Sequence, residues 1–261
     1  MSKLPFSGKE ADALRRYKGS PYAINNFLTG KHQSVDTGDY PLEALVEDIF
    51  ALVESMTPTQ NDTIVWRGTS LNYYPELKDL SEKAIGKCID MPLLVSTSYS
   101  EDQGPVFAAQ IFAAQNDEKC IFKINLPAGT PVHDRFPNVF TDVDSINLDD
   151  DEEEVLLAPA NVVVNNISTF SKTEFGEDDF GNEVEHVLTY TLIEVDYGQP
   201  LNIYELIINA LVKMAKKFPN KVSRINAIVA DLTEKRRYGT ISAEDGIETE
   251  TGANPEAEMS V

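Results

Sequence analysis

The chain of 261 residues has few of the residues that build metal sites or disulfide frameworks. It contains two cysteines, Cys88 and Cys120, and three scattered histidines. The cysteines form no Cys-x-x-Cys pair and no cysteine–histidine spacing typical of a structural zinc site. Both lie in or near apolar stretches. We therefore expect two reduced cysteines in the core and no bound metal.

Positive charge and long apolar runs are also scarce. Lys and Arg total 22 against 43 Asp and Glu, so the formal net charge is -21. Nucleic-acid binders need a basic face, and this balance disfavours that class. No run reaches the roughly 18 apolar residues of a membrane-spanning helix, and the N-terminus has no apolar signal-peptide core. We expect no membrane partner and a cytoplasmic location, either as made or after delivery into a host without a classical signal peptide.

Helical and strand-like patterns occupy different parts of the chain. The stretch "YPLEALVEDIFALVESM" (residues 40–56) has apolar residues at helical spacing, like the segments before it. Short β-rich runs follow, among them "DTIVWRG" and "MPLLVSTSYS". Because the strands do not alternate regularly with helices, the pattern predicts an α+β fold rather than a doubly wound sheet.

The last sixty residues change character twice. Two amphipathic helices are predicted after residue 198, beginning with "NIYELIINALVKMAKKF". From Gly239 to Val261 the chain has six acids, no bases and few large apolar residues, which is typical of disorder. We expect a main domain over 1–198, a helical appendage over 199–238 and an acidic disordered tail over 239–261.

Three predicted strands carry polar residues at their ends. Arg67 closes "IVWRG", Ser96 opens Ser-Thr-Ser in "LLVSTSY", and Glu154 begins "EVLLAP" after an acidic run. Taken singly, they are typical of a surface charge, a polar strand edge and a solvated loop. Together they offer a cation for phosphates, and a carboxylate that a hydroxyl can hold near a developing sugar cation. The residues alone indicate an anionic-ligand or glycosyl-transfer site.

The order Arg, Ser-Thr-Ser, Glu-x-Glu resembles the toxin-type, clostridial-like ADP-ribosyltransferases of the Arg–Ser–Glu class. Other stretches resemble this family in the same order. They are "ALRRYKGSPYAINNFLTG", "CIFKINLPAGTPV", "EEEVLLAPANVVV" and "HVLTYTLIEVDY". The resemblance spans about residues 11–197 and makes 1–198 an ADP-ribosyltransferase domain. It implies N-terminal helices packed on a two-sheet β-core, with the C-terminal helices added.

The resemblance also implies an activity and a set of roles. NAD would be the co-substrate, without a metal, and nicotinamide would leave as ADP-ribose is transferred. Arg67 would bind the phosphates, the Gly68 backbone would hold the nicotinamide amide, and Ser96 would orient Glu154. Glu154 would bind the ribose hydroxyl and stabilise the oxocarbenium ion. The implied NAD-binding residues are Tyr17, Tyr22, Asn26, Arg67, Gly68, Ser96, Phe107 and Glu154.

The residue two positions before Glu154 sets the expected acceptor. In the family, Glu at this position accompanies arginine as acceptor, and Glu152 occupies it here. A carboxylate can orient a guanidinium and accept its proton. In a strand, Glu152 and Glu154 would share one side while Glu153 points away. The implied catalytic set is therefore Arg67, Ser96, Glu152 and Glu154, and the implied enzyme is an arginine-specific mono-ADP-ribosyltransferase, a phage enzyme or bacterial effector.

Two departures from the family pattern bear on substrates. Gln110 replaces a family arginine, which would weaken binding of the NAD phosphates. The segment 129–154 is longer than in compact toxins, and its acidic residues suit a basic target surface. Its aspartates include Asp142, Asp144, Asp149, Asp150 and Asp151. We expect a target protein with an accessible arginine; a nucleic-acid acceptor is the less favoured alternative. An NAD glycohydrolase and a degenerate, non-catalytic binding module remain alternatives, and the complete catalytic set argues against the second.

Overall fold

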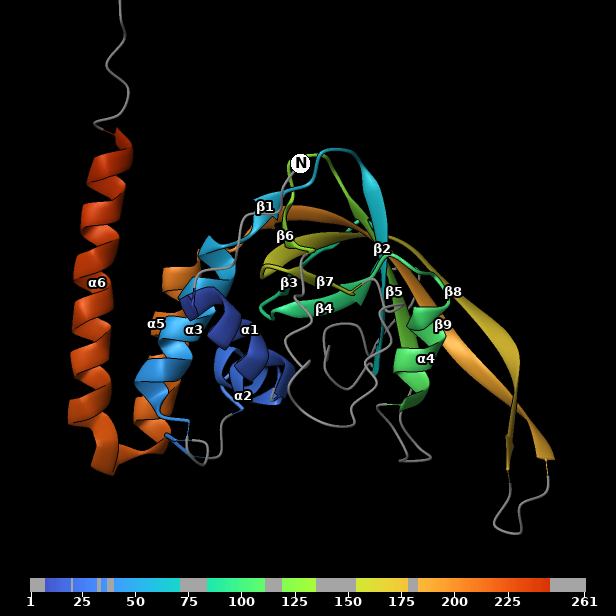
Figure 1. Cartoon of the computed structure of the whole chain (residues 1–261), viewed down its shortest axis with the longest axis horizontal. Coiled ribbons are helices and arrows are strands. Elements are labelled where there is room, and N and C mark those ends of the chain that lie inside the picture. Colours follow the sequence, from blue (N-terminus) through green and yellow to red (C-terminus); the bar gives the residue numbers. More distant parts are fainter. Residues whose placement is uncertain are drawn as a thin grey trace, which may run out of the picture.

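The computed structural model describes residues 8–19, 21–31, 34–36, 40–70, 84–110, 119–134, 154–177 and 183–244. Within these residues the α-helices are α1 (Gly8–Gly19), α2 (Pro21–Leu28), α3 (Leu42–Glu54), α4 (Gln103–Gln110), α5 (Ile203–Lys217) and α6 (Val222–Glu244). The strands are β1 (Thr57–Pro58), β2 (Thr63–Ser70), β3 (Cys88–Met91), β4 (Val95–Ser98), β5 (Lys119–Leu126), β6 (Pro131–His133), β7 (Glu154–Leu157), β8 (Ala160–Glu177) and β9 (Glu183–Pro200). The expected α+β class is confirmed, with most helices gathered on one side of the sheet (Figure 1).

The strands form one connected sheet in the order β1-β6-β7-β4-β2-β5-β9-β8-β3. Of the pairs between described strands, β5–β9 is parallel and the others are antiparallel. A single residue pair, Trp66 opposite Ser98, joins β2 to β4 and divides the sheet into two halves. One hydrophobic cluster takes residues from both halves, such as Val155 and Leu157 from one and Phe122 and Val195 from the other. The two halves therefore enclose a common core, in line with the expected two-sheet arrangement.

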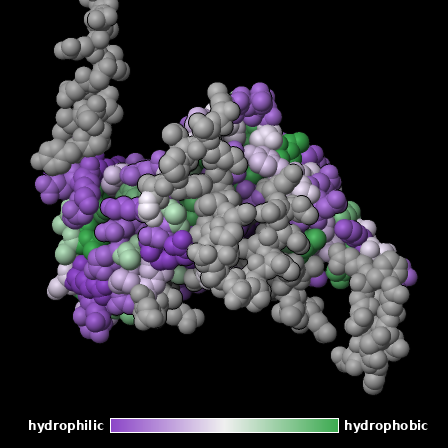
Figure 2. Space-filling model, in the orientation of Figure 1, coloured by the Kyte–Doolittle hydropathy of each residue, from purple (hydrophilic) through white to green (hydrophobic). Residues whose placement is uncertain are grey.

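A second core lies between the helices and the β4–β7 part of the sheet. On α3, Leu42, Leu45 and Ile49 follow the i, i+3, i+7 spacing of one helix face and are buried. Leu94 and Leu156 from the sheet pack in the same cluster. Fully burying such a side chain contributes roughly 1.5–3 kcal/mol, so this cluster fixes the helices on the sheet. The outer face of the helical part is largely hydrophilic in the view of Figure 2.

Helices α5 and α6 belong to this second core rather than standing apart. Ile207 and Leu211 of α5 and Ile225 of α6 are buried in it beside residues of α1, α2 and α3. At the start of α5, the Asn202 side chain accepts a hydrogen bond from the Glu205 amide, a favourable N-cap. The domain boundaries at 198 and 238 stay predictions, and residues 245–261 lie outside the described part of the chain.

Helix α1 is tied to its neighbours by polar contacts at both ends. Asp48 of α3 is 3% exposed and accepts hydrogen bonds from Arg16 and from Tyr40. The hydrogen bond from Arg16 to Asp48 raises the pKa of Arg16 above its ordinary value, so Arg16 stays charged. At the other end, Glu10 lies 3.2 Å from the ring of His133 on β6. These contacts fix how α1 crosses the sheet.

One sequence expectation about the cysteines is wrong. Cys120 is buried in the central strand β5, as expected, but Cys88 is exposed. The reason is topological: Cys88 begins β3, which lies at the end of the strand order and has a neighbour on one side only. Neither of these two described cysteines forms a disulfide. Among the described helices, none combines the length and apolar character that a bilayer crossing requires.

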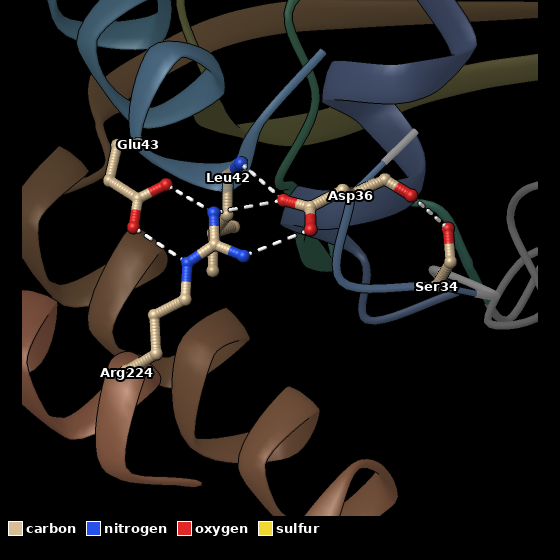
Figure 3. Close-up of polar contacts among 5 residues, drawn as sticks. All are labelled: Ser34, Asp36, Leu42, Glu43 and Arg224. Carbon is tan, nitrogen blue, oxygen red and sulfur yellow. Dashed lines mark hydrogen bonds and ion pairs between the residues drawn. The ribbon is translucent and has the colours of Figure 1, made fainter. Parts of the chain in front are cut away.

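Arg224 of α6 links the C-terminal helices to the rest of the protein (Figure 3). Its guanidinium lies between Glu43 of α3 and Asp36 in the preceding loop, donating to both carboxylates. The Asp36 carboxylate also accepts from the Leu42 amide at the start of α3. Hydrogen bonding to Arg224 holds the pKa values of Asp36 and Glu43 below their ordinary range. This network adds polar contacts beside the hydrophobic cluster to which α3 and α6 both contribute.

We expect Arg224→Met to lower the free energy of unfolding at pH 7 by about 1 kcal/mol, a modest value because all three side chains are a third or more exposed to screening solvent. Both carboxyl pKa values are depressed by folding, so the pairs stabilise above the unfolded values of 3.8 and 4.5 and lose this contribution as the pH falls through the folded values. Urea denaturation across pH 3–7 should show the difference from wild type shrinking in acid. The control Lys235→Met removes an exposed pair with Asp231 on the same helix and should change stability by less than about 0.5 kcal/mol. A difference constant over the whole range would contradict the assignment.

Candidate active site

Three adjacent strands bring the predicted polar residues together. In the strand order, β7, β4 and β2 are neighbours, and they carry Glu154, Ser96 and Arg67 respectively. Arg67 and Ser96 are 29 positions apart in the sequence, and Ser96 and Glu154 are 58 positions apart. The site thus lies where the two halves of the sheet meet. The expectation that Arg67 ends its strand is wrong, because β2 continues to Ser70, but its side chain still reaches Ser96 on β4.

The register of β4 and β7 explains how Ser96 reaches Glu154. Glu154 stands opposite Ser98, and Ser96 stands opposite Leu156, so the two partners are diagonal neighbours on one face. A glutamate side chain is long enough to span this diagonal. The Ser96 hydroxyl donates to Oε1 of Glu154 at 2.5 Å. The hydroxyl thereby fixes one oxygen of the carboxylate.

Arg67 connects β2 to the same point. Its Nη1 donates to the backbone carbonyl of Ser96, across the seam between the two sheet halves. Its Nε is buried and makes no hydrogen bond to the described residues. Within the described part of the chain the guanidinium therefore has one hydrogen-bonded anchor, and its Nε can still donate to an anion beside the strand.

Gly68 follows Arg67 where helix α4 approaches the strand most closely. A Cβ built on Gly68 would lie 2.1 Å from the Gly104 carbonyl oxygen and 2.2 Å from the Ala108 amide nitrogen. Only glycine allows this approach. The result is that α4, which carries Phe107, lies directly against the backbone of β2.

A cleft opens over these strands. Seven of the eight residues expected to bind NAD line it, and they are Tyr17, Tyr22, Asn26, Arg67, Gly68, Ser96 and Phe107. The eighth, Glu154, joins the site through its hydrogen bond to Ser96. The structure therefore collects helices α1, α2 and α4 and strands β2 and β4 around one cavity. Aromatic rings, a cation and backbone groups converge there, as a nucleotide ligand requires.

The two tyrosines differ in exposure. Tyr17 is buried, and its hydroxyl donates to the Leu94 carbonyl at 3.1 Å. Burial raises the pKa of Tyr17 well above its ordinary value, so the hydroxyl stays protonated and remains a donor. Tyr22 is 56% exposed at the mouth of the cleft. Tyr17 thus supports the wall, whereas the ring of Tyr22 is open to a ligand.

Sequence reasoning overlooked two residues beside the expected ones. Asn25 accepts from the Leu94 amide and donates to the Leu94 carbonyl, each at 3.0 Å, which clamps α2 to the start of β4. Lys18 forms an ion pair with Glu154. Each is adjacent in sequence to a predicted residue, Asn26 or Tyr17. That adjacency was the only available signal, because both contacts join segments far apart in the chain.

Other predicted site residues fall outside the described part of the chain. These are Glu152 and Glu153, the five aspartates at 142, 144 and 149–151, and the side chain of Gln110. Their roles stay predictions. Trp66, the residue before Arg67, is partly buried beside Lys123, whose ammonium lies 5.8 Å from the ring centroid.

A comparison with protein-family models identifies the family. The model of the ADP-ribosyltransferase exoenzyme family matches residues 2–175, two thirds of the chain. The chain belongs to this family. Among curated proteins no sequence matches it. For this ADP-ribosyltransferase family member, the resemblance read from Arg67, Ser96 and Glu154 is therefore confirmed at the level of family and fold.

A comparison with solved structures finds ADP-ribosyltransferase toxins at low similarity. Plx2a from Paenibacillus larvae is 13% identical, with a TM-score of 0.48, covering 74% of this chain and 88% of the toxin. BECa, from a binary enterotoxin of C. perfringens and solved with NADH, is 18% identical (TM-score 0.46; 74% and 44% covered). The Vis toxin from Vibrio splendidus is 17% identical (TM-score 0.45; 74% of each chain covered). At identities this low, a ligand bound by one of those toxins is not thereby a ligand of this protein.

Proposed function

We propose that this protein is an NAD-dependent mono-ADP-ribosyltransferase that modifies arginine side chains of a target protein. The observation that carries the proposal is the arrangement of Arg67, Ser96 and Glu154 on adjacent strands beneath one cleft. Membership of the exoenzyme family supports the reaction class. The choice of arginine rests on Glu152, two residues before Glu154.

In the proposed reaction, the bond between nicotinamide nitrogen and ribose C1′ breaks first. Its electron pair goes to the nicotinamide, which leaves neutral, and positive charge develops on C1′. Arg67 binds the NAD phosphates, and the Gly68 backbone and Phe107 hold the nicotinamide. Glu154 binds the ribose hydroxyl and stabilises the oxocarbenium ion. An arginine nitrogen of the target then bonds to C1′, and Glu152 takes the proton that this nitrogen loses.

The electrostatics of Glu154 suit this role. Its side chain is 12% exposed, so its charge acts in surroundings of lower effective dielectric than water. A fixed anion beside a developing cation lowers the barrier without reorganising solvent, and removing one such group typically costs two to three orders of magnitude in rate. The hydrogen bond from Ser96 keeps that anion in place.

The acceptor assignment is tested with Glu152→Ala. We expect transfer to arginine to fall by about 100-fold while NAD hydrolysis persists, because general-base help contributes roughly 10²–10⁴ and water needs it less than a guanidinium does. Labelled NAD is incubated with protein and cell lysate, and modified peptides are mapped to the residue by mass spectrometry. Wild-type label on arginine supports the proposal. Free ADP-ribose without labelled protein would indicate a glycohydrolase, and no NAD consumption would indicate a binding module. Good arginine modification by Glu152→Gln would refute the assignment.

We further propose that the target presents its arginine on a basic surface in the cytoplasm of a host. The acidic segment before Glu154 carries the five aspartates at 142, 144 and 149–151. Changing all five to asparagine should raise the Michaelis constant for the target severalfold but leave that for NAD unchanged, since surface charge mainly steers association. Steady-state kinetics with each substrate varied in turn measures both, and the effect should weaken as salt is added. An unchanged constant for the target would contradict the proposal.

A further inference from the structure

A lysine holds the second oxygen of the Glu154 carboxylate. Nζ of Lys18 lies 2.6 Å from Oε2, while the Ser96 hydroxyl binds Oε1 at 2.5 Å. The side chains of Lys18 and Glu154 are only 16% and 12% exposed. The contact is therefore a largely buried ion pair, unlike the exposed pairs that contribute little.

The position of Lys18 follows from the anchoring of α1. It lies in the last turn of the helix, where a cation interacts favourably with the helix dipole. The two preceding residues are both fixed: Arg16 donates to Asp48, and Tyr17 donates to Leu94. Lys18 is thus presented to β7 by a helix held on two sides. Its contact with Glu154 comes from the fold rather than from a loose surface chain.

Lys18 acts on the carboxylate and not on the cleft. Ser96 and Tyr17 line the cleft, whereas Lys18 does not. A buried carboxylate costs several kcal/mol to keep charged unless it is paired and hydrogen bonded. Lys18 supplies the pairing charge and Ser96 supplies a hydrogen bond. With both oxygens engaged, the carboxylate has one preferred orientation.

We propose that Lys18 is a positioning residue that holds the Glu154 carboxylate in the correct orientation for the reaction. The inference rests on the proposed function, because it assigns Lys18 a role through Glu154. It also makes Lys18 part of the transferase's machinery although Lys18 does not line the cleft. Its removal should therefore affect the chemical step rather than NAD binding.

The test uses Lys18→Met, which keeps the unbranched stem and removes the charge, and Lys18→Arg, which restores a cation. Hydrolysis of NAD is measured over a range of NAD concentrations, so no target is needed. We expect kcat to fall by about 10- to 100-fold in Lys18→Met, the usual range for a residue that orients a reacting group, with KM changed less than about threefold. Lys18→Arg should recover most of kcat. Lys9→Met, which removes an exposed cation from the same helix, should behave as wild type.

Several outcomes would overturn the proposal. They are an unchanged kcat in Lys18→Met, a raised KM with unchanged kcat, and no recovery in a folded Lys18→Arg. A double-mutant cycle on thermal unfolding, with Lys18→Met and Glu154→Gln, tests the ion pair without any turnover. Coupling supports the pair, and additivity refutes it. If the wild-type protein consumes no NAD, the proposed function fails, and Lys18 loses its positioning role even where the cycle shows coupling. If the wild-type protein is active and Lys18→Met has the same kcat, only the Lys18 proposal is refuted.

Discussion

Glu154→Gln is expected to lower both ADP-ribose transfer and NAD hydrolysis by about a thousandfold. Glutamine has the shape of glutamate, and its amide oxygen can still accept from the Ser96 hydroxyl. It has no charge, so it cannot stabilise the oxocarbenium ion or pair with Lys18. Rates of nicotinamide release and of label transfer, measured at saturating NAD, give the two losses. NAD binding, measured by calorimetry, should change far less than either rate.

Glu194→Gln is the matched control. Glu194 lies on β9, is ion paired with Lys123 at 3.0 Å and accepts a hydrogen bond from Asn166, but it does not line the cleft. Its replacement removes the same charge from a similarly paired strand residue and should leave both rates within about twofold of wild type. Retention of more than a tenth of wild-type activity by Glu154→Gln would refute the role of its charge.

Gly68→Ala is expected to destabilise the fold by more than about 3 kcal/mol, or to prevent folding at 37 °C. The new methyl group would meet the carbonyl of Gly104 and the amide of Ala108, both backbone atoms well inside contact distance. Neither can rotate away, so α4 would have to leave β2. The same displacement would move Phe107 and weaken NAD binding. Chemical denaturation and NAD titration measure the two effects.

Gly8→Ala provides the comparison. An added Cβ at Gly8 meets nothing within 4 Å, and the residue lies in the first turn of α1. The Gly8→Ala variant should be as stable as the wild-type protein or slightly more stable, because alanine favours a helix. Equal stability of the two variants would mean that α4 approaches β2 less closely than the structure shows.

The sequence could predict the site because its residues lie in short strands within recognisable motifs. Arg67, Ser96 and Glu154 were found in this way, and the apolar spacing of α3 predicted its buried face. The ion pair of Lys18 with Glu154 could not be predicted, because it depends on how α1 crosses β7. The order of the strands in the sheet could not be predicted either, because it also depends on how distant segments pack. The exposure of Cys88 follows from the edge position of β3, which local hydrophobicity does not reveal.

The seam between β2 and β4 has a consequence for how the substrate affects the protein. Among the described residues, the strand pairing between the two halves is the single pair Trp66–Ser98, and beside it Arg67 donates to the Ser96 carbonyl. NAD bound as proposed would contact Arg67 on one half and Glu154 on the other. The dinucleotide would then act as a non-covalent crosslink between the halves, and part of its binding free energy would appear as cohesion of the sheet.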